Sequence, residues 1–447
     1  MNAIAPAASR RATLALGTSG LAAAALPPLL APRPARAQAP ERREDLVRGF
    51  SRERLARFRP AMEREIERGS FPGAVALVAR GGEVVHLEAY GHQDAARQRP
   101  MDRDAIFLLA SMTKPIVSTA AMMLAEEGRM KLGDPIAAWL PELRDLKVEA
   151  RRMGTDGRVA HEDVAPTRPI TVQDLLRHTS GFFYADSAPS ARLRDLYREH
   201  NIQANAGPIP GDEMLRRLGT IPLAHQPGTT FEYSISVDVL GLLLERLAGT
   251  RLDRLVEERL TGPLGMRDTA WSVGPDRQPR LAEAPDSDPQ KARMWREYRI
   301  TEDEAGRSYL RGGAGLVGTA TDYFRFAQMV ANGGLFEGRR YLAEPMVNYM
   351  LSNHTVGMAG SPAASTGPGY GFGLGFAVRL QDGVGAAPGT AGDAMWAGAW
   401  GTSFTIDRAQ GLVGVLMAQG PSIRTHTRMV FKNLVYGAMV EGARPRE

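Results

Sequence analysis

The spacing of apolar residues changes along the first part of the chain, from residue 45 to residue 91. Between residue 45 and Gly69 apolar side chains recur at roughly helical spacing, which predicts a helix that ends at this glycine. The residues that carry the spacing are Leu46, Phe50, Leu55, Phe58 and Met62. Two runs rich in Val, Leu and Ala then flank the pair Gly81-Gly82, and this arrangement predicts a β-hairpin over residues 73–91.

The middle of the chain, from about residue 105 to 345, has a mostly helical pattern with polar loops. We expect one helix from the Ser111 region to Gly128. Further helices are predicted over residues 171–179, 236–249 and 319–334. The polar segments 149–168 and 272–308 are interpreted as surface insertions, and the Gly/Ser/Pro stretch 356–369 as a loop.

The last part of the chain returns to short β-type runs and ends on an amphipathic helical pattern. The predicted strands lie within residues 369–380, 400–408 and 411–420, and the closing helix spans 424–441. Because both ends are β-rich and the middle is helical, we expect an α+β fold. An antiparallel β-sheet flanked by helices would be built from both chain ends, with a mostly helical subdomain inserted between them.

The domain prediction follows from this arrangement. A single domain is expected over residues 45–442. Its sheet region would comprise about 45–100 and 365–442, and its helical region about 105–345.

The first 37 residues have the pattern of an export signal. Arg10 and Arg11 precede an apolar Ala/Leu run, which closes on the A-x-A pattern Ala35-Arg36-Ala37. The arginine pair resembles a twin-arginine signal, with a general secretory signal as the alternative. The apolar run is short and interrupted, so no stable membrane span is expected. We therefore predict a periplasmic or secreted protein.

Charge and composition exclude several classes of function. The formal net charge of +5 falls to about +1 once the four arginines of the predicted signal are removed, and the remaining basic residues are interleaved with acidic ones, so no nucleic-acid partner is expected. The chain has no cysteine, and its eight histidines show no H-E-x-x-H pattern. No metal, nucleotide or flavin cofactor is predicted, and the oligomeric state stays open.

The stretch "FLLASMTKPIV", residues 107–117, places Ser111 and Lys114 one helical turn apart on the same face. Apolar neighbours would desolvate Lys114 and lower its pKa, so that a neutral amine could accept the proton of the serine hydroxyl. The field of the helix N-terminus would favour a developing oxyanion. The alternative is a helix-capping serine beside a solvated lysine. Lysine is scarce, with only five in the chain, and an arginine could not act as a base.

Four further motifs follow "SMTK" in order. They are "HTSGF" at 178–182, "PGTTFEYSISVDVLG" at 227–241, "PLGMRDTAW" at 263–271 and "GGAGLVGTATDYFRFA" at 312–327. Together they resemble the serine β-lactamase and penicillin-binding-protein superfamily. The nearest resemblance is to class C β-lactamases and family VIII carboxylesterases, over essentially the whole chain after the signal.

The resemblance implies roles for individual residues. Ser111 would be the acylated nucleophile, and Lys114 would activate it. Tyr233, in "EYSIS", would share the proton transfers, provided that the Lys114 ammonium lowers the pKa of its phenol from about 10. The alternative for Tyr233 is a core aromatic residue. His178 is interpreted as structural, since the G-x-S-x-G motif of many Ser-His-Asp hydrolases is absent.

The sequence departs from the β-lactamase pattern at two positions. The usual K-T-G motif is replaced by Trp396-Ala397-Gly398, and the usual Asn two residues after the tyrosine is Ile235. By this match, the backbone N–H groups of Ser111 and Ala399 would form the oxyanion hole. A glycine-rich turn with packed tryptophans is the alternative. An apolar lining suits uncharged esters better than a penicillin-like acid.

The predicted function is therefore a serine hydrolase that cleaves carboxylic esters through a covalent acyl-enzyme. Its partner would be a small-molecule ester or amide. The alternatives are a β-lactamase, a D-amino-acid peptidase or amidase, or a transesterase of the same fold. A non-catalytic cell-wall-binding homologue is a further alternative. The deacylation base is left open, with Tyr233 as the candidate.

Overall fold

The computed structural model describes residues 45–155, 157–202, 209–291 and 309–442. These residues belong to one compact unit of the chain. The predicted export signal, residues 1–37, lies outside the described residues. No helix among the residues described is both long enough and apolar enough to cross a bilayer.

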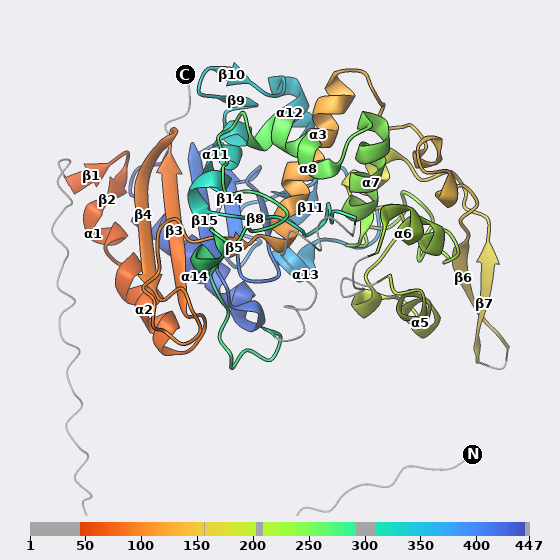
Figure 1. Cartoon of the computed structure of the whole chain (residues 1–447), viewed down its shortest axis with the longest axis horizontal. Coiled ribbons are helices and arrows are strands. Elements are labelled where there is room, and N and C mark those ends of the chain that lie inside the picture. The colour runs from red at the N-terminus through yellow and green to blue at the C-terminus, as the bar shows by residue number, and fades with distance from the viewer. Residues whose placement is uncertain (1–44, 156, 203–208, 292–308, 443–447) are drawn as a thin grey trace, which may run out of the picture. The chain divides into compact units, whose positions relative to one another are not determined.

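A seven-stranded antiparallel sheet in the order β11-β12-β13-β14-β15-β3-β4 forms the centre of the fold. Its strands are β3 (Gly73–Arg80), β4 (Glu83–Gly91), β11 (Tyr370–Phe372), β12 (Ala377–Arg379), β13 (Ala394–Ala397), β14 (Ser403–Asp407) and β15 (Leu412–Ala418). Strand β15 pairs with β3 along seven residues of each strand, so the two ends of the chain meet inside the sheet. Figure 1 shows the orange strands β3 and β4 beside the blue C-terminal strands. The predicted α+β class and the origin of the sheet in both ends are confirmed.

The hairpin predicted about Gly81-Gly82 is present as β3 and β4. Gly81 has φ +60° and Gly82 has φ +84°, and such positive values at both central residues suit a two-residue turn that matches the twist of the strands. Strand β3 is buried along nearly all its length because alternate residues contribute to two hydrophobic cores. Ala74, Ala76 and Val78 belong to one core, and Val75, Leu77 and Ala79 to the other.

Helices cover both faces of this sheet. One core joins the sheet to α1 (Arg52–Leu55), α2 (Phe58–Glu67) and α14 (Arg424–Ala438). The other, larger core joins it to α3 (Thr113–Glu126), α7 (Ser236–Ala248) and α11 (Ala320–Ala331). The amphipathic patterns of the sequence thus correspond to packed helix–sheet layers.

The remaining elements lie mostly in the predicted helical region. The α-helices are α4 (Val172–Leu176), α5 (Ala191–Glu199), α6 (Gly211–Leu218), α8 (Leu252–Val256), α12 (Glu344–Met350) and α13 (Ala363–Thr366). Short strand pairs are β5 (Phe107–Leu108) with β8 (Val317–Gly318), β6 (Val148–Met153) with β7 (Val159–Val164), and β9 (Leu335–Phe336) with β10 (Arg339–Arg340). The 3₁₀ helices are η2 (Ala110–Met112), η3 (Ile136–Ala138), η4 (Pro141–Leu143), η5 (Ala185–Ser187), η7 (Gln278–Arg280) and η8 (Pro421–Ile423), and η6 (Glu257–Thr261) is a π-helix.

One expectation about local structure was wrong. The predicted helix over 45–69 begins instead with a small hairpin, β1 (Leu46–Val47) and β2 (Phe50–Ser51), because the backbone turns at Arg48 and Gly49 with positive φ. The helical part is then divided into α1 and α2 by a break at residues 56–57. The polar segment 149–168, expected as a surface insertion, is mainly the largely exposed β6–β7 hairpin, and the segment 272–308 is described only to residue 291.

Candidate active site

Ser111 lies in the 3₁₀ helix η2, immediately before α3. The sequence predicted it in the first turn of the α-helix itself. The preceding residue, Ala110, has φ +46°, a conformation that costs free energy for a residue with a Cβ and persists only where its surroundings impose it. At Ala110, hydrogen bonds on both sides hold the backbone in this conformation. The Leu109 N–H donates to the Leu316 carbonyl at 3.0 Å, and the Tyr323 hydroxyl donates to the Met112 carbonyl at 3.0 Å.

Lys114 is fully buried, and its Nζ has three oxygen neighbours. Nζ donates to the Gly313 carbonyl at 2.7 Å, and it lies 3.2 Å from the Tyr184 hydroxyl and 3.4 Å from Ser111 Oγ. Burial lowers the pKa of Lys114 to about 7, because the charge of Asp238 offsets only part of the desolvation cost. A substantial fraction of neutral amine is therefore present at neutral pH.

Tyr233 precedes α7 and is half-buried beside both residues. The Lys114 Nζ lies 4.6 Å from the centre of the Tyr233 ring, and the Trp396 indole N–H donates to the Tyr233 hydroxyl at 3.3 Å. The expectation that the Lys114 ammonium lowers the pKa of Tyr233 was wrong. Burial raises this pKa above its usual value, although hydrogen bonds with Ser111 and Trp396 act in the opposite direction. The phenol therefore keeps its proton at neutral pH.

The end of strand β13 approaches the backbone just before Ser111. A Cβ at Gly398 would collide with the Leu109 carbonyl oxygen and the Thr402 hydroxyl, so only a glycine allows this approach. The Gly398 N–H donates to the Thr402 carbonyl at 2.9 Å, which fixes the turn that carries Ala399. The predicted element Trp396-Ala397-Gly398 thus lies against the backbone at Leu109, two residues before Ser111.

The structure brings together most of the predicted site residues. Ser111, Lys114, Tyr233 and Trp396 form a connected set of contacts. Trp396 is buried, and its ring also packs edge-on against Phe372. Ile235 is buried in the larger core, at the start of α7, and its contact with a substrate stays a prediction.

His178 is buried near this set but has the surroundings of a structural residue. Its Nδ1 lies 3.3 Å from Ser234 Oγ and accepts from the Ser234 N–H, and its ring packs 4.7 Å from the Tyr233 ring. Burial, together with the charge of Lys114, lowers the pKa of His178 well below its usual value. The imidazole is therefore neutral and supports the position of the Tyr233 ring.

Sequence reasoning missed three residues around Lys114: Tyr184, Asp238 and Gly313. Tyr184 follows the "HTSGF" motif by two positions and could have been found only by spatial contact. Asp238 lies in the first turn of α7, where an acidic residue usually interacts with the helix N-terminus. Gly313 was part of a quoted motif, but nothing in the sequence indicates that its carbonyl binds a lysine.

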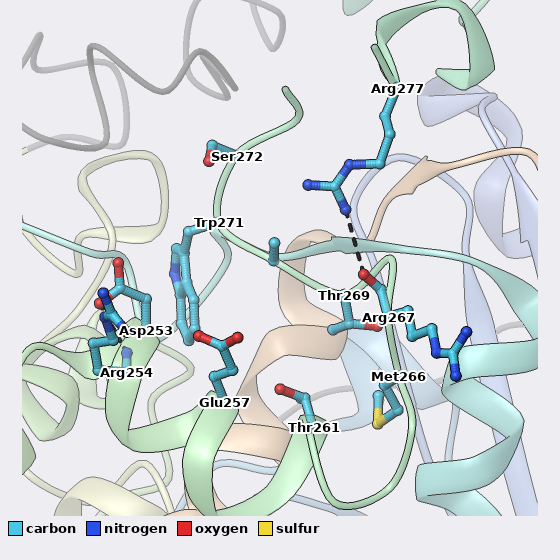
Figure 2. Close-up of a pocket in the computed structure, with 12 residues that line it drawn as sticks. Asp253, Arg254, Glu257, Thr261, Met266, Arg267, Thr269, Trp271, Ser272 and Arg277 are labelled. Carbon is cyan, nitrogen blue, oxygen red and sulfur yellow. Dashed lines mark hydrogen bonds between the residues drawn. The ribbon is translucent and has the colours of Figure 1, made fainter. Parts of the chain in front are cut away.

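A cavity of about 430 Å³ lies between α8, η6 and the loop 266–277 (Figure 2). None of Ser111, Lys114 and Tyr233 lines it. The Trp271 ring forms part of its wall, and the Trp271 indole N–H donates to the Arg311 carbonyl at 3.1 Å. Trp271 therefore contacts both the cavity and the loop that supplies Gly313, two residues after Arg311.

The chain is similar to known proteins over most of its length. Protein Rv1367c of Mycobacterium tuberculosis (strain ATCC 25618 / H37Rv) is 33% identical over 363 residues, which cover 78% of this chain and 86% of the relative. Esterase EstB of Burkholderia gladioli is 33% identical over 379 residues, which cover 81% of this chain and 89% of the relative. The solved structure of "EstCE1, a hydrolase with promiscuous acyltransferase activity" matches with a TM-score of 0.70 and 27% identity, over 86% of this chain and 98% of that one.

The family model described as Beta-lactamase matches residues 23–429, which is most of the chain. This match, the esterase relative and the shared fold identify the protein as a serine hydrolase. The chain belongs to the Beta-lactamase family, within the serine β-lactamase and penicillin-binding-protein superfamily, and has esterases among its relatives.

Proposed function

We propose that this protein hydrolyses carboxylic esters through a covalent acyl-enzyme on Ser111. The observation that carries the proposal is the Lys114 amine. It is fully buried, has a pKa of about 7 and lies 3.4 Å from Ser111 Oγ. A buried amine that is partly neutral near pH 7 can accept the serine proton as the hydroxyl attacks.

The acylation step can be written from these contacts. Ser111 Oγ attacks the ester carbonyl carbon while its proton passes to Lys114 Nζ. The carbonyl oxygen becomes an oxyanion, which would accept hydrogen bonds from the Ser111 and Ala399 N–H groups. When the tetrahedral intermediate collapses, the bond to the alcohol oxygen breaks, and the protonated phenol of Tyr233 donates a proton to the leaving alkoxide.

Deacylation repeats these steps with water as the nucleophile. The Tyr233 phenolate left by the first half-reaction regains its proton from the Lys114 ammonium or takes one from the attacking water. Lys114, which takes a proton from the attacking water in the first route and keeps its own in the second, is then an ammonium and reprotonates the Ser111 alkoxide when the acid product leaves. An alcohol in place of water would give ester exchange, an activity consistent with the promiscuous acyltransferase activity of EstCE1.

The substrate class follows from Trp396. By the resemblance to β-lactamases, the indole stands where that pattern has the lysine of K-T-G, and its N–H is directed at the Tyr233 hydroxyl. An indole supplies no positive charge for a substrate carboxylate. The name of the relative EstB supports an ester rather than a β-lactam as the preferred substrate.

The test compares p-nitrophenyl butyrate with nitrocefin on the purified protein, and follows each reaction by intact-protein mass spectrometry. We expect ester turnover that exceeds nitrocefin turnover by at least about 100-fold, and a butyryl adduct on wild type that Ser111→Ala lacks. Faster nitrocefin turnover would assign the protein to the β-lactamases. The absence of any adduct or fluorophosphonate labelling would favour a non-catalytic binding protein.

We also propose that residues 1–37 direct export to the periplasm through the twin-arginine pair Arg10-Arg11. Replacing both arginines by lysine should retain a reporter fusion in the cytoplasm of a bacterial host. Continued export of the double variant would indicate the general secretory route.

A further inference from the structure

Gly313 connects the Lys114 amine to a buried carboxylate on α7. The Gly313 carbonyl accepts from Lys114 Nζ at 2.7 Å, which is the shortest contact of that amine. The N–H of the same residue donates to Asp238 Oδ1 at 3.2 Å. Gly313 thus donates its N–H to Asp238 and accepts the Lys114 amine at its carbonyl.

Asp238 is buried to a degree that is unusual for a carboxylate. Its exposed fraction is 1%, and its Oδ2 has no hydrogen-bond partner among the residues that the structure describes. Arg311 Nε lies 3.9 Å from Oδ1. A carboxylate with so few partners costs free energy, and it is expected to persist only where it has a role that an apolar residue could not fill.

The loop lies close to the first turn of α7 at both glycines of the pair. A Cβ at Gly313 would collide with Asp238 Oδ2, and a Cβ at Gly312 would collide with the Val237 carbonyl. A side chain at either position would require a shift, of the Asp238 carboxylate at Gly313 and of backbone at Gly312, so the loop backbone lies directly on the first turn of α7. The position of the Gly313 carbonyl follows from this contact.

We propose that Asp238 is a positioning residue for the proton transfer at Ser111. Through the Gly313 N–H it fixes the carbonyl that orients Lys114 Nζ toward Ser111 Oγ, and its negative charge keeps the amine from becoming too weak a base. The inference rests on the proposed function, because it assigns Asp238 a part in that same reaction. Asp238 itself does not touch the reacting atoms.

The charge effect has a definite sign. The Asp238 carboxylate raises the pKa of Lys114, and burial lowers it. Removal of the charge should therefore lower the pKa of the amine further, so that the neutral form prevails at a lower pH. Other titratable or charged groups that face Lys114 or Asp238 from neighbouring elements are Tyr184, Tyr233, His178, Arg311 and Tyr309.

Three variants separate positioning from charge. Asp238→Asn keeps an oxygen acceptor for the Gly313 N–H and removes the charge, Asp238→Ala removes both, and Gly313→Ala keeps the charge but displaces the loop. For Asp238→Asn we expect kcat within about 10-fold of wild type, with the rising limb of the kcat/KM profile shifted to lower pH by about half a unit or more. For Asp238→Ala and Gly313→Ala we expect kcat to fall about 100-fold with little change in KM.

Asp393→Asn is the matched control, because Asp393 is also a buried carboxylate but lies directly before β13, where it pairs with Arg379 and Lys432. It should lower Tm and leave the pH profile unchanged. An Asp238→Asn enzyme with the wild-type profile, or a folded Asp238→Ala enzyme with the wild-type kcat, would overturn the inference. If Ser111→Ala stayed active, the proposed function itself would fail. If Ser111→Ala is inactive but the Asp238 variants behave like wild type, only the inference about Asp238 fails.

Discussion

The Nζ of Lys114 lies closer to the carbonyl oxygen of Gly313, at 2.7 Å, than to the Oγ of Ser111, at 3.4 Å. A neutral amine has two N–H donors and one lone pair. If the donors are directed at the Gly313 carbonyl and the Tyr184 hydroxyl, the lone pair faces Ser111 Oγ. The contacts with Gly313 and Tyr184 therefore orient the Lys114 amine so that it can accept the proton of Ser111.

The first prediction concerns the pH dependence of the wild-type enzyme. The pKa of Lys114 is lowered to about 7, so the amine is protonated and inactive as a base well below pH 7 and neutral above it. We expect kcat/KM for p-nitrophenyl butyrate to rise through an apparent pKa near 7 and to level off by about pH 8. A flat profile between pH 5.5 and 9, measured over the range where the protein stays folded, would contradict the assignment of Lys114.

Lys114→Arg tests the same amine by substitution. Arginine keeps the positive charge but cannot lose its proton at neutral pH, and its larger planar head has to fit a fully buried site. We expect kcat/KM to fall by at least about 1000-fold at every pH. Lys131→Arg, at an exposed lysine, is the control and should retain wild-type kinetics.

Tyr233→Phe should affect substrates according to their leaving group. Burial raises the pKa of Tyr233, so this residue is a proton donor in the resting enzyme. An alkoxide needs that proton when it leaves, whereas p-nitrophenolate is a stable anion near neutral pH. We expect acylation by ethyl butyrate to slow about 100-fold or more and acylation by p-nitrophenyl butyrate to slow far less, as measured by adduct formation over time. Equal losses for both esters would show that Tyr233 does not protonate the leaving group.

Gly398→Ala should reduce activity through the backbone at the end of β13. Its Cβ would collide with the Leu109 carbonyl, so the turn that carries Ala399 has to move away from Ser111. We expect kcat to fall about 100-fold, as for the loss of one oxyanion donor. Gly437→Ala in α14 is the control, because a Cβ there meets no atom within 4 Å, and it should keep wild-type kcat. Similar kcat values for the two variants would exclude a role of the β13 end in the oxyanion site.

Trp271→Phe tests the other support of the glycine loop. The change removes the indole N–H that donates to the Arg311 carbonyl and leaves a smaller ring beside the cavity (Figure 2). We expect the free energy of unfolding to fall by about 2 kcal/mol in urea titrations. The same substitution at the half-buried Trp139 should cost less. An unchanged urea midpoint for Trp271→Phe would show that the loop does not depend on this bond.

The sequence predicted those features that depend on local pattern. The Gly81-Gly82 turn and the helix that follows Ser111 were found because turn residues and apolar periodicity act over short distances. The helix expected from residue 45 begins only at Arg52, because the backbone turn at Arg48-Gly49 makes the preceding residues a hairpin of β1 and β2. A single glycine in an apolar pattern does not by itself distinguish a helix end from a hairpin turn.

The site divides in the same way. Ser111, Lys114 and Tyr233 could be named from ordered motifs, and the structure brings them together. The contacts of Lys114 with Gly313 and Tyr184 join segments 199 and 70 residues away, so no spacing rule reports them. The pKa of Tyr233 was predicted with the wrong sign, because burial of its ring is a property of the packed fold and not of its neighbours in sequence.

The pairing of β15 with β3 has a consequence for synthesis of the chain. Residues Leu412–Ala418 complete the hydrogen bonding of a strand that ends at Arg80, so more than 300 residues emerge from the ribosome before the centre of the sheet can close. Until then β3 has only β4 as a partner, and an isolated two-stranded hairpin is marginally stable in water. Nascent chains that stop before residue 412 should therefore be protease-sensitive, and folding should become complete only once translation is almost finished.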